Sequence, residues 1–315
     1  MRVTAFGAAE RLARRAGART LLFGSGLLFG LSAVLAKLAT RGPGGMSGAQ
    51  ATTVRFALGL AFVGILFTAR PGTFRPVKGW LLVSRGFFGG VAALLYFVAI
   101  SSISPGEATL LNNTFPIWAV ILSFFFLRER PTLHLAVALA IASVGVYLVM
   151  GGGHATFHLG FGQALAILSA IFGGVAVTAI RTLRRTDNAP TIFFAFAIGG
   201  LAVSLPFAGG PWPTTPLPWI AALGMGVVAF GAQLLMTQSY GELSVPEAAL
   251  WQQLNPIASY AWSLTIGERL TPWTVVGVVL GATGIVYGAV LGHRPSRDAR
   301  PEQRAAAEGI PLEEP

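Results

Sequence analysis

The sequence predicts an all-α integral membrane protein with ten transmembrane helices, arranged as two inverted five-helix repeats. Three observations lead to this prediction: an apolar composition, a series of membrane-length apolar stretches, and a second half that repeats the first. Of the 315 residues, 54% are hydrophobic and only 11% are charged, and the mean hydropathy is +0.67. A soluble domain with this composition would have too few polar residues to cover its surface.

Ten apolar stretches each have about the 20 residues that a helix needs to cross the hydrocarbon of a bilayer. Their apolar residues run continuously rather than in alternation, which favours helices over the strands of a barrel. Short connections with turn residues, such as 41–45 and 209–211, separate them. The predicted spans are residues 21–39, 49–69, 79–101, 105–127, 133–150, 161–180, 189–207, 217–239, 245–266 and 271–291.

The second half of the chain repeats the first. Pro116 and Pro256 are 140 residues apart, and after them Glu129 pairs with Glu268 at a shift of 139. Because each copy holds five spans, an odd number, the second copy enters the membrane from the opposite side. Two inverted repeats are a natural basis for alternating access to a central site, which points to a transporter. The predicted parts are a basic cytoplasmic N-terminus (1–20), the first repeat (21–150), an outer linker (151–160), the second repeat (161–291) and a disordered cytoplasmic tail (292–315).

The Lys and Arg residues predict the orientation in the membrane. With both termini in the cytoplasm, 17 of the 22 basic residues fall in cytoplasmic segments, two in outer loops and three within spans. Cytoplasmic loops of membrane proteins carry the excess of positive charge, so this distribution places both termini inside the cell. It also explains the net charge of +10 without a nucleic-acid partner, because the basic residues form no single face.

A pattern recurs around the fourth and ninth spans: a capped helix start, small residues, a mid-span proline, then Glu-Arg, and a glycine in the next span. The matching residues are Pro116, Glu129-Arg130 and Gly145, and again Pro256, Glu268-Arg269 and Gly284. Over residues 21–291 the chain resembles the ten-helix EamA-type members of the drug/metabolite transporter superfamily. The resemblance implies an inner-membrane permease that exports amino acids or similar metabolites through a cavity shared by the two halves. It leaves the substrate open, and an importer of another metabolite or a non-transporting membrane assembly subunit is the alternative.

Four amides mark a candidate substrate site at the centre of the membrane. Asn112 and Asn113 lie mid-span in the first half, and Gln252 and Gln253 are their equivalents in the second. An amide in hydrocarbon is costly unless it has a partner, so these side chains face a neighbouring helix or a cavity. Adjacent residues point about 100° apart on a helix. One member of each pair could therefore line a cavity while the other bonds to a neighbouring helix.

Three further residues extend the candidate site. Arg55 breaks the internal symmetry, because its equivalent in the second repeat is Phe193. It could bind a substrate carboxylate, or its side chain could extend to the membrane surface. Trp251 and Tyr96 are candidate walls for the substrate, with packing or lipid contact as the alternative. Arg85, close to the inner end of its span, is expected to extend to the interface or to be paired.

Pro116 and Pro256 are predicted hinge or kink positions. A proline cannot donate a hydrogen bond to the carbonyl one turn earlier, so each loosens the helix beside the amides. Glu107 and Glu247 stand in Ser-x-x-Glu patterns, and capping of a helix start explains them better than proton transport. The spans contain no other carboxylate. Uncoupled transport is therefore the simpler mechanism, and coupling through these two glutamates stays open.

The sequence indicates no enzyme and no cofactor. A membrane-embedded enzyme needs a nucleophile, a base or metal ligands that converge at depth, and the spans contain no such set. His154 and His158 have the spacing of metal ligands but no third ligand nearby, and the chain has no cysteine. We therefore expect no catalytic residue, no cofactor and no metal. The expected partners are a small-molecule substrate and the lipid bilayer, and the sequence leaves a homodimer open.

Overall fold

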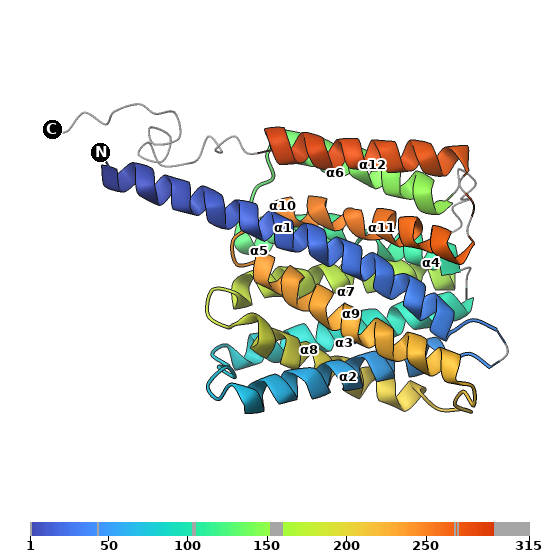
Figure 1. Ribbon diagram of the computed structural model, residues 1–315. Helices are drawn as coiled ribbons and strands as arrows, with labels where there is room; N and C mark the ends of the chain where they lie inside the picture. Colours follow the sequence, from blue (N-terminus) through green and yellow to red (C-terminus); the bar gives the residue numbers. More distant parts are fainter. Residues whose placement is uncertain are drawn as a thin grey trace.

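A computed structural model of the chain shows a bundle of helices whose axes are roughly aligned (Figure 1). The structure describes residues 2–42, 44–102, 105–151, 160–267, 269 and 271–292. Within these residues every regular element is a helix. Most of the predicted outer linker, including His154 and His158, and the predicted tail from residue 293 lie outside the described residues.

The helices follow the predicted spans closely. The first half contains α1 (Arg2–Ala39), α2 (Gly48–Ala69), α3 (Gly79–Ser102), α4 (Pro105–Asn112), α5 (Phe115–Leu127) and α6 (Leu133–Gly151). The second half contains α7 (Phe161–Leu183), α8 (Ala189–Ser204), η1 (Leu205–Phe207), α9 (Pro216–Ser239), α10 (Val245–Gln252), α11 (Leu254–Ser263), η2 (Leu264–Ile266) and α12 (Pro272–Leu291).

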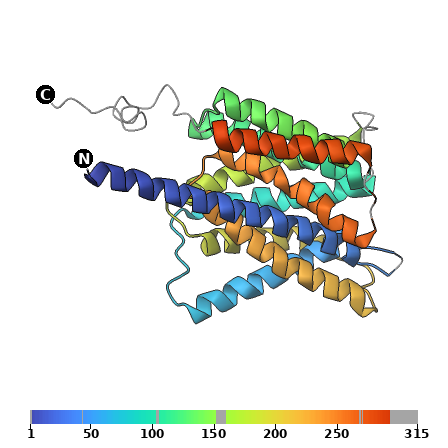
Figure 2. The same cartoon turned by 45° about the horizontal axis from the view of Figure 1, so that its top comes forward.

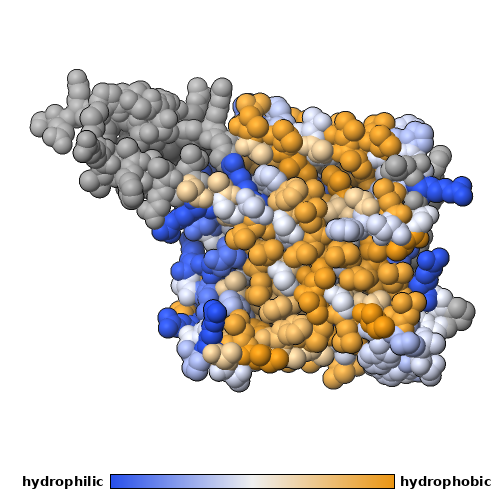
Figure 3. Space-filling model, in the orientation of Figure 1, coloured by the Kyte–Doolittle hydropathy of each residue, from blue (hydrophilic) through white to orange (hydrophobic). Residues whose placement is uncertain are grey.

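The surface of the bundle is that of a multi-pass membrane protein. Eight segments of the described chain are long and apolar enough to cross a membrane, and Leu133–Val149 is a shorter apolar helix. The predicted span 245–266 is not among them, because α10 with 8 residues and α11 with 10 are each too short to cross alone. Large apolar side chains point outward, for example Phe126 at 76% and Leu133 at 77% exposure. Figure 3 shows a broad apolar face with hydrophilic residues gathered toward its two ends.

Helix α1 is much longer than a membrane crossing. Its 38 residues at 1.5 Å per residue give about 57 Å, whereas the hydrocarbon core is about 30 Å thick. Its N-terminal end projects beyond the other helices in both views (Figures 1 and 2). The membrane-length apolar part is Ala13–Ala39. The boundary expected after residue 20 therefore lies inside one continuous helix.

The two halves pack against each other through exchanged pairs of helices. α1 packs on α9 of the second half, and α7 packs on α3 of the first. In the same way α1 contacts α11 while α7 contacts α5. The pairs α2 with α8 and α6 with α12 each join two equivalent helices of the two halves. These helices of the two halves therefore have matching neighbours.

Glycines allow the closest of these contacts. A Cβ atom added to Gly145 of α6 would lie 2.6 Å from the Cα of Gly281 on α12. A Cβ added to Gly90 of α3 would lie 2.7 Å from the carbonyl oxygen of Gly199 on α8. No side chain fits at these positions without moving one helix backbone away from the other. Small residues at helix crossings in membranes have this effect in general, because they let two backbones approach.

The fourth and ninth predicted spans are each interrupted in the middle. α4 ends at Asn112 and α5 begins at Phe115, while α10 ends at Gln252 and α11 begins at Leu254. The sequence predicts a kink beside the prolines, and the structure has two separate helices joined by a turn. A proline has no N–H to continue the helical hydrogen bonds across this point. The chain makes tighter bonds instead: the N–H of Thr114 donates to Leu111 at 3.1 Å, and that of Gln253 donates to Leu250 at 3.1 Å.

Candidate substrate-binding cavity

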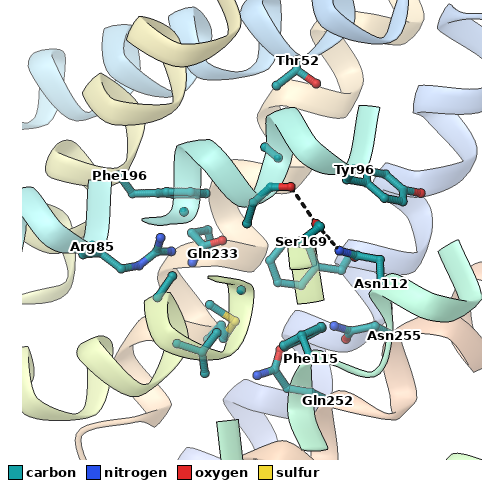
Figure 4. A pocket seen from close by; sticks show the side chains of 18 of the residues that line it. Thr52, Arg85, Tyr96, Asn112, Phe115, Ser169, Phe196, Gln233, Gln252 and Asn255 are labelled. Carbon is teal, nitrogen blue, oxygen red and sulfur yellow. Dashed lines mark hydrogen bonds between the residues drawn. The ribbon is translucent and has the colours of Figure 1, made fainter. Parts of the chain in front are cut away.

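A cavity of about 330 Å³ lies between the two halves, beside the two interrupted spans. This volume is in the range of small-molecule sites, about 300–1,000 Å³. Helices of both halves line it, and Figure 4 shows side chains from several of them around one space. Its polar lining residues are Thr52, Arg55, Arg85, Tyr96, Asn112, Ser169, Gln233, Gln252 and Asn255.

The structure brings four of the seven predicted substrate-binding residues to this cavity and places the other three behind its wall. Asn112, Gln252, Arg55 and Tyr96 belong to the lining, and Asn113, Gln253 and Trp251 do not. The difference follows from the rotation of each helix, because neighbouring residues point in directions about 100° apart.

In the first half the two amides have different partners. The Nδ2 of Asn112 donates to the hydroxyl of Ser169 at 2.7 Å. Ser169 in turn donates to the carbonyl of Ala92 at 2.7 Å, as the dashed lines in Figure 4 show. This chain of bonds connects α4 to α7 and α3 at the cavity wall. The Nδ2 of Asn113, in the turn after α4, donates to the carbonyl of Thr109 in α4 at 2.9 Å.

In the second half both amides are buried and bonded to side chains. The Nε2 of Gln252 donates to the hydroxyl of Tyr240 at 2.6 Å, and the Tyr240 side chain is fully buried. The Nε2 of Gln253 donates to the hydroxyl of Ser143 on α6 at 3.1 Å. Gln252 thus lines the cavity, while Gln253 connects α10 to a neighbouring helix.

Tyr96 and Trp251 occupy different surroundings. The hydroxyl of Tyr96 shares a hydrogen bond of 2.6 Å with the hydroxyl of Thr109, so the polar end of the tyrosine has a partner at the cavity wall. Trp251 packs edge-to-face against Phe23 of α1, with 6.5 Å between ring centroids. Its ring therefore joins α10 to α1 through aromatic packing.

Both arginines of α2 and α3 contribute to the cavity. The guanidinium carbon of Arg55 lies 5.8 Å from the centre of the Phe56 ring. That of Arg85 lies 3.9 Å from the centre of the Phe196 ring, and Arg85 is only 3% exposed. Arg85 therefore does not extend to the membrane surface, and it is paired with the Phe196 ring. A cation over an aromatic face is stabilised by the ring, which gives this buried position a physical basis.

Glycine at position 89 makes room for the buried guanidinium. A Cβ atom added to Gly89 would overlap Nη1 of Arg85 and would lie 2.8 Å from the Phe196 ring. Gly89 follows Arg85 by one turn on α3, so its missing side chain leaves the space into which Arg85 turns. This spacing is the sequence signal that could have identified Arg85.

Gln233, Asn255 and Ser169 also belong to the lining, and the sequence analysis did not single them out. Gln233 and Asn255 are amides within predicted spans, so the argument used for Asn112 would have found them. The serine gives no comparable signal, because its hydroxyl can bond to a nearby carbonyl of its own helix.

A cluster of polar groups connects the helix ends on the side predicted to be cytoplasmic. The carboxylate of Glu129 accepts hydrogen bonds from Nε of Arg181 at 3.0 Å and from the backbone N–H of Val245 at 2.7 Å. Nη1 of Arg181 donates to the carbonyls of Tyr240 and Gly241 at 3.0 and 2.9 Å. The turn after α5 is thereby joined to α7 and to the start of α10.

Glu247 belongs to a similar contact nearby. Its carboxylate accepts a hydrogen bond of 2.9 Å from Nε of Arg19 on α1. Its backbone N–H donates to the hydroxyl of Ser244 at 3.4 Å, which is one half of the predicted capping box. The side chain of Glu107, the equivalent residue of the first half, lies outside the described residues.

Comparisons with known proteins agree with this architecture. A solved crystal structure superposes with a TM-score of 0.74 at 20% identity, covering 89% of this chain and 100% of the other, which supports the fold alone. The pseudopaline exporter CntI of Pseudomonas aeruginosa is 25% identical over 203 residues, 64% of this chain and 71% of that protein. Solute carrier family 35 member G1 of Mus musculus is 23% identical over 222 residues, 64% of this chain and 60% of that protein.

The sequence profile of the EamA-like transporter family matches twice, at residues 18–151 and 160–288. The two matches correspond to the two halves of the bundle and together cover most of the chain. This protein therefore belongs to the EamA-like transporter family.

Proposed function

We propose that the chain is an inner-membrane permease that moves a small polar metabolite, exporting amino acids or related compounds by alternating access. Membership of the EamA-like transporter family supports transport. The similarity to a protein named as an exporter favours the outward direction. Import of another small metabolite is the alternative, and a non-transporting assembly subunit is disfavoured because it needs no polar cavity.

Ten membrane crossings in two inverted repeats, 21–150 and 161–291, belong to this proposal. The exchanged helix pairs support it, since the contacts of α1 with α9 and α11 have counterparts in the contacts of α7 with α3 and α5. The span 245–266 has 22 residues, which is about the length of one crossing even though it is interrupted. Both termini would then face the cytoplasm, where the excess of Lys and Arg lies.

The observation that carries the proposal is the polar cavity at the junction of the two interrupted spans. A polar space between two repeats at membrane depth is where transporters of this kind bind their solutes. Asn112 and Gln252 would hydrogen-bond the solute, with Tyr96 forming part of the wall. Pro116 and Pro256 would act as hinges, because the helix segments on either side of each break can change their angle.

Transport by the purified chain in liposomes tests this proposal. We expect saturable flux of at least one amino acid or related metabolite. The variant Asn112→Ala/Gln252→Ala should lose most of this flux while remaining folded. Phe126→Ala, on the outer surface at 76% exposure, is the matched control and should transport like the wild type. Equal flux from the cavity variant and this control would reject the proposed site.

A further inference from the structure

The cavity carries two positive charges and no negative charge among its described lining residues. The positive charges are Arg55 of α2 and Arg85 of α3. Glu129 and Glu247 are engaged with other arginines, and Asp187 accepts a hydrogen bond from the backbone N–H of Val77 at 2.8 Å. None of these three carboxylates lines the cavity. The charge of the two arginines is therefore not balanced by the described cavity wall.

Arg85 is the more deeply buried of the two. It is 3% exposed, and its Nε has no hydrogen-bond partner among the described residues. A buried charge with an unmade hydrogen bond is costly, and contact with the Phe196 ring offsets only part of this cost. Charged residues at membrane depth commonly mark the path or the site of a charged solute.

The two guanidinium groups stand beside one aromatic pair. The rings of Phe56 and Phe196 meet edge-to-face with 5.0 Å between their centroids. Arg55 lies near the first ring and Arg85 near the second. Both arginines line the same cavity of about 330 Å³.

Gln233 provides a third donor to this cavity. It is 4% exposed, and its Nε2 has no hydrogen-bond partner within the described part of the chain. Figure 4 shows Gln233 and Arg85 among the side chains that surround the cavity. The unpaired Nε2 of Gln233 and the unpaired Nε of Arg85 each need a hydrogen-bond acceptor. A carboxylate supplies several acceptor positions.

We propose that the transported solute is a small organic anion with two acidic groups. Arg85 and Gln233 bind one group and Arg55 binds the other. A zwitterionic solute with one carboxylate fits less well, because its ammonium group meets no carboxylate among the described lining residues. This inference rests on the proposed transport function and narrows its substrates, amino acids or related compounds, to the related compounds that carry two acidic groups.

The test uses the full chain in liposomes of phosphatidylcholine, a zwitterionic lipid, so that no anionic headgroup competes for the arginines. Flux of succinate is compared with that of succinamate and succinamide, which replace one or both acidic groups by amides of similar size. We expect a preference for the diacid over the diamide of about tenfold or more, the range of hydrogen bonds to charged groups. Arg85→Gln and Arg55→Gln should each reduce this preference by about tenfold.

Two further variants address the position of the Arg85 charge. Gly89→Ala fills the space of the guanidinium and should reduce the preference for the diacid. Gly64→Ala on α2, where a Cβ meets nothing within 4 Å, is the matched control and should keep it. Should Gly89→Ala fail to fold, Arg85→Lys serves instead. It retains the charge but loses the two-pronged contact, and it should weaken diacid binding less than Arg85→Gln.

The outcomes separate this inference from the proposed function. Saturable flux of neutral polar solutes without preference for diacids would leave the permease in place and overturn the anionic substrate. A preference for diacids that survives both Arg→Gln substitutions would also overturn it. If no solute shows flux, thermal unfolding of the purified chain decides, because a bound solute raises the melting temperature. Equal melting temperatures with succinate and succinamide would then reject the inference.

Discussion

The break between α4 and α5 and the break between α10 and α11 occupy equivalent places in the two halves, but their amides have different partners. In the second half Gln252 and Gln253 are 3% and 1% exposed and bond to the side chains of other elements. In the first half Asn112 and Asn113 are only partly buried, and Asn113 bonds to Thr109 in the preceding helix.

This comparison shows which features of the break are the same in both copies of the repeat and which differ. Both copies keep an amide pair, a proline and an interruption of the helix. The partners of the second amide have diverged, since Gln253 reaches α6 whereas Asn113 returns to the carbonyl of Thr109. The amides at the break in the second half are therefore more deeply buried than those at the break in the first half.

The largest effect is expected for Gln252→Ala, which combines a role in the cavity with a buried hydrogen bond. Flux should fall by about tenfold or more, the effect of losing a strong polar contact to the solute. The free energy of unfolding should fall by about 1–3 kcal/mol, because the buried hydroxyl of Tyr240 loses its partner. Liposome flux and thermal unfolding measure the two effects separately.

Tyr240→Phe provides the control for Gln252→Ala. The double variant removes both partners and should recover part of the stability without recovering flux. Recovery of flux in the double variant would show that Gln252 only stabilises the fold and does not bind the solute.

Gln253→Ala should affect stability but not transport. The substitution removes a buried bond to Ser143, which costs about 1–3 kcal/mol in the free energy of unfolding. Flux per folded molecule should stay near that of the wild type, since Gln253 does not line the cavity. A cycle with Ser143→Ala measures the coupling of the two residues. Loss of flux at full stability would place Gln253 in the site and contradict the division of roles.

Substitution of the two prolines compares the mobility of the two breaks. Pro116→Ala restores a backbone N–H and lets α4 and α5 approach a continuous helix. We expect a slower maximal flux with unchanged apparent affinity, because a stiffer hinge slows the conformational step rather than binding. Pro256→Ala should have the smaller effect, since both amides at its break are buried and bonded to side chains of other elements. A larger effect of Pro256→Ala on maximal flux would show that the break between α10 and α11 is the one that moves during transport.

Asn113→Ala should have the smallest effect of these substitutions. The carbonyl of Thr109 accepts both the side-chain amide and the backbone N–H of Asn113, each at 2.9 Å. It therefore keeps one donor after the substitution. Alanine also favours a helix more than asparagine does. The free energy of unfolding should fall by less than for Gln253→Ala, because the Asn113 side chain is only partly buried. Flux should match the wild type, since Asn113 does not line the cavity. A large loss in either measurement would mean that the first half uses both amides, as the second does.

Much of this fold could be predicted because apolar length decides where a chain crosses a membrane. The helix limits of the spans 189–207 and 271–291 follow the sequence within a few residues. The position of the amides beside the cavity could also be predicted from the sequence, since an amide at membrane depth must have a partner. The rotation of each helix could not be predicted from the sequence, because the packing of neighbouring helices determines which of Asn112 and Asn113 faces the cavity.

The arginines show the same limit. Arg55 could be singled out from the broken repeat, whereas the burial of Arg85 depends on contacts between helices far apart in the sequence. It requires the Phe196 ring from α8 and the open space at Gly89. The sequence predicted that Arg85 extends to the interface or is paired, and the tertiary contacts bury it against the Phe196 ring.

The space at position 89 links the size of one residue to the charge of another. Arg85 occupies the volume that a single methyl group at position 89 would fill. A descendant that acquires alanine there must lose or redirect the guanidinium, so the two positions should be inherited together among close relatives. If the solute is the anion proposed above, a one-codon change on α3, far from any loop, would remove one of its two guanidinium partners.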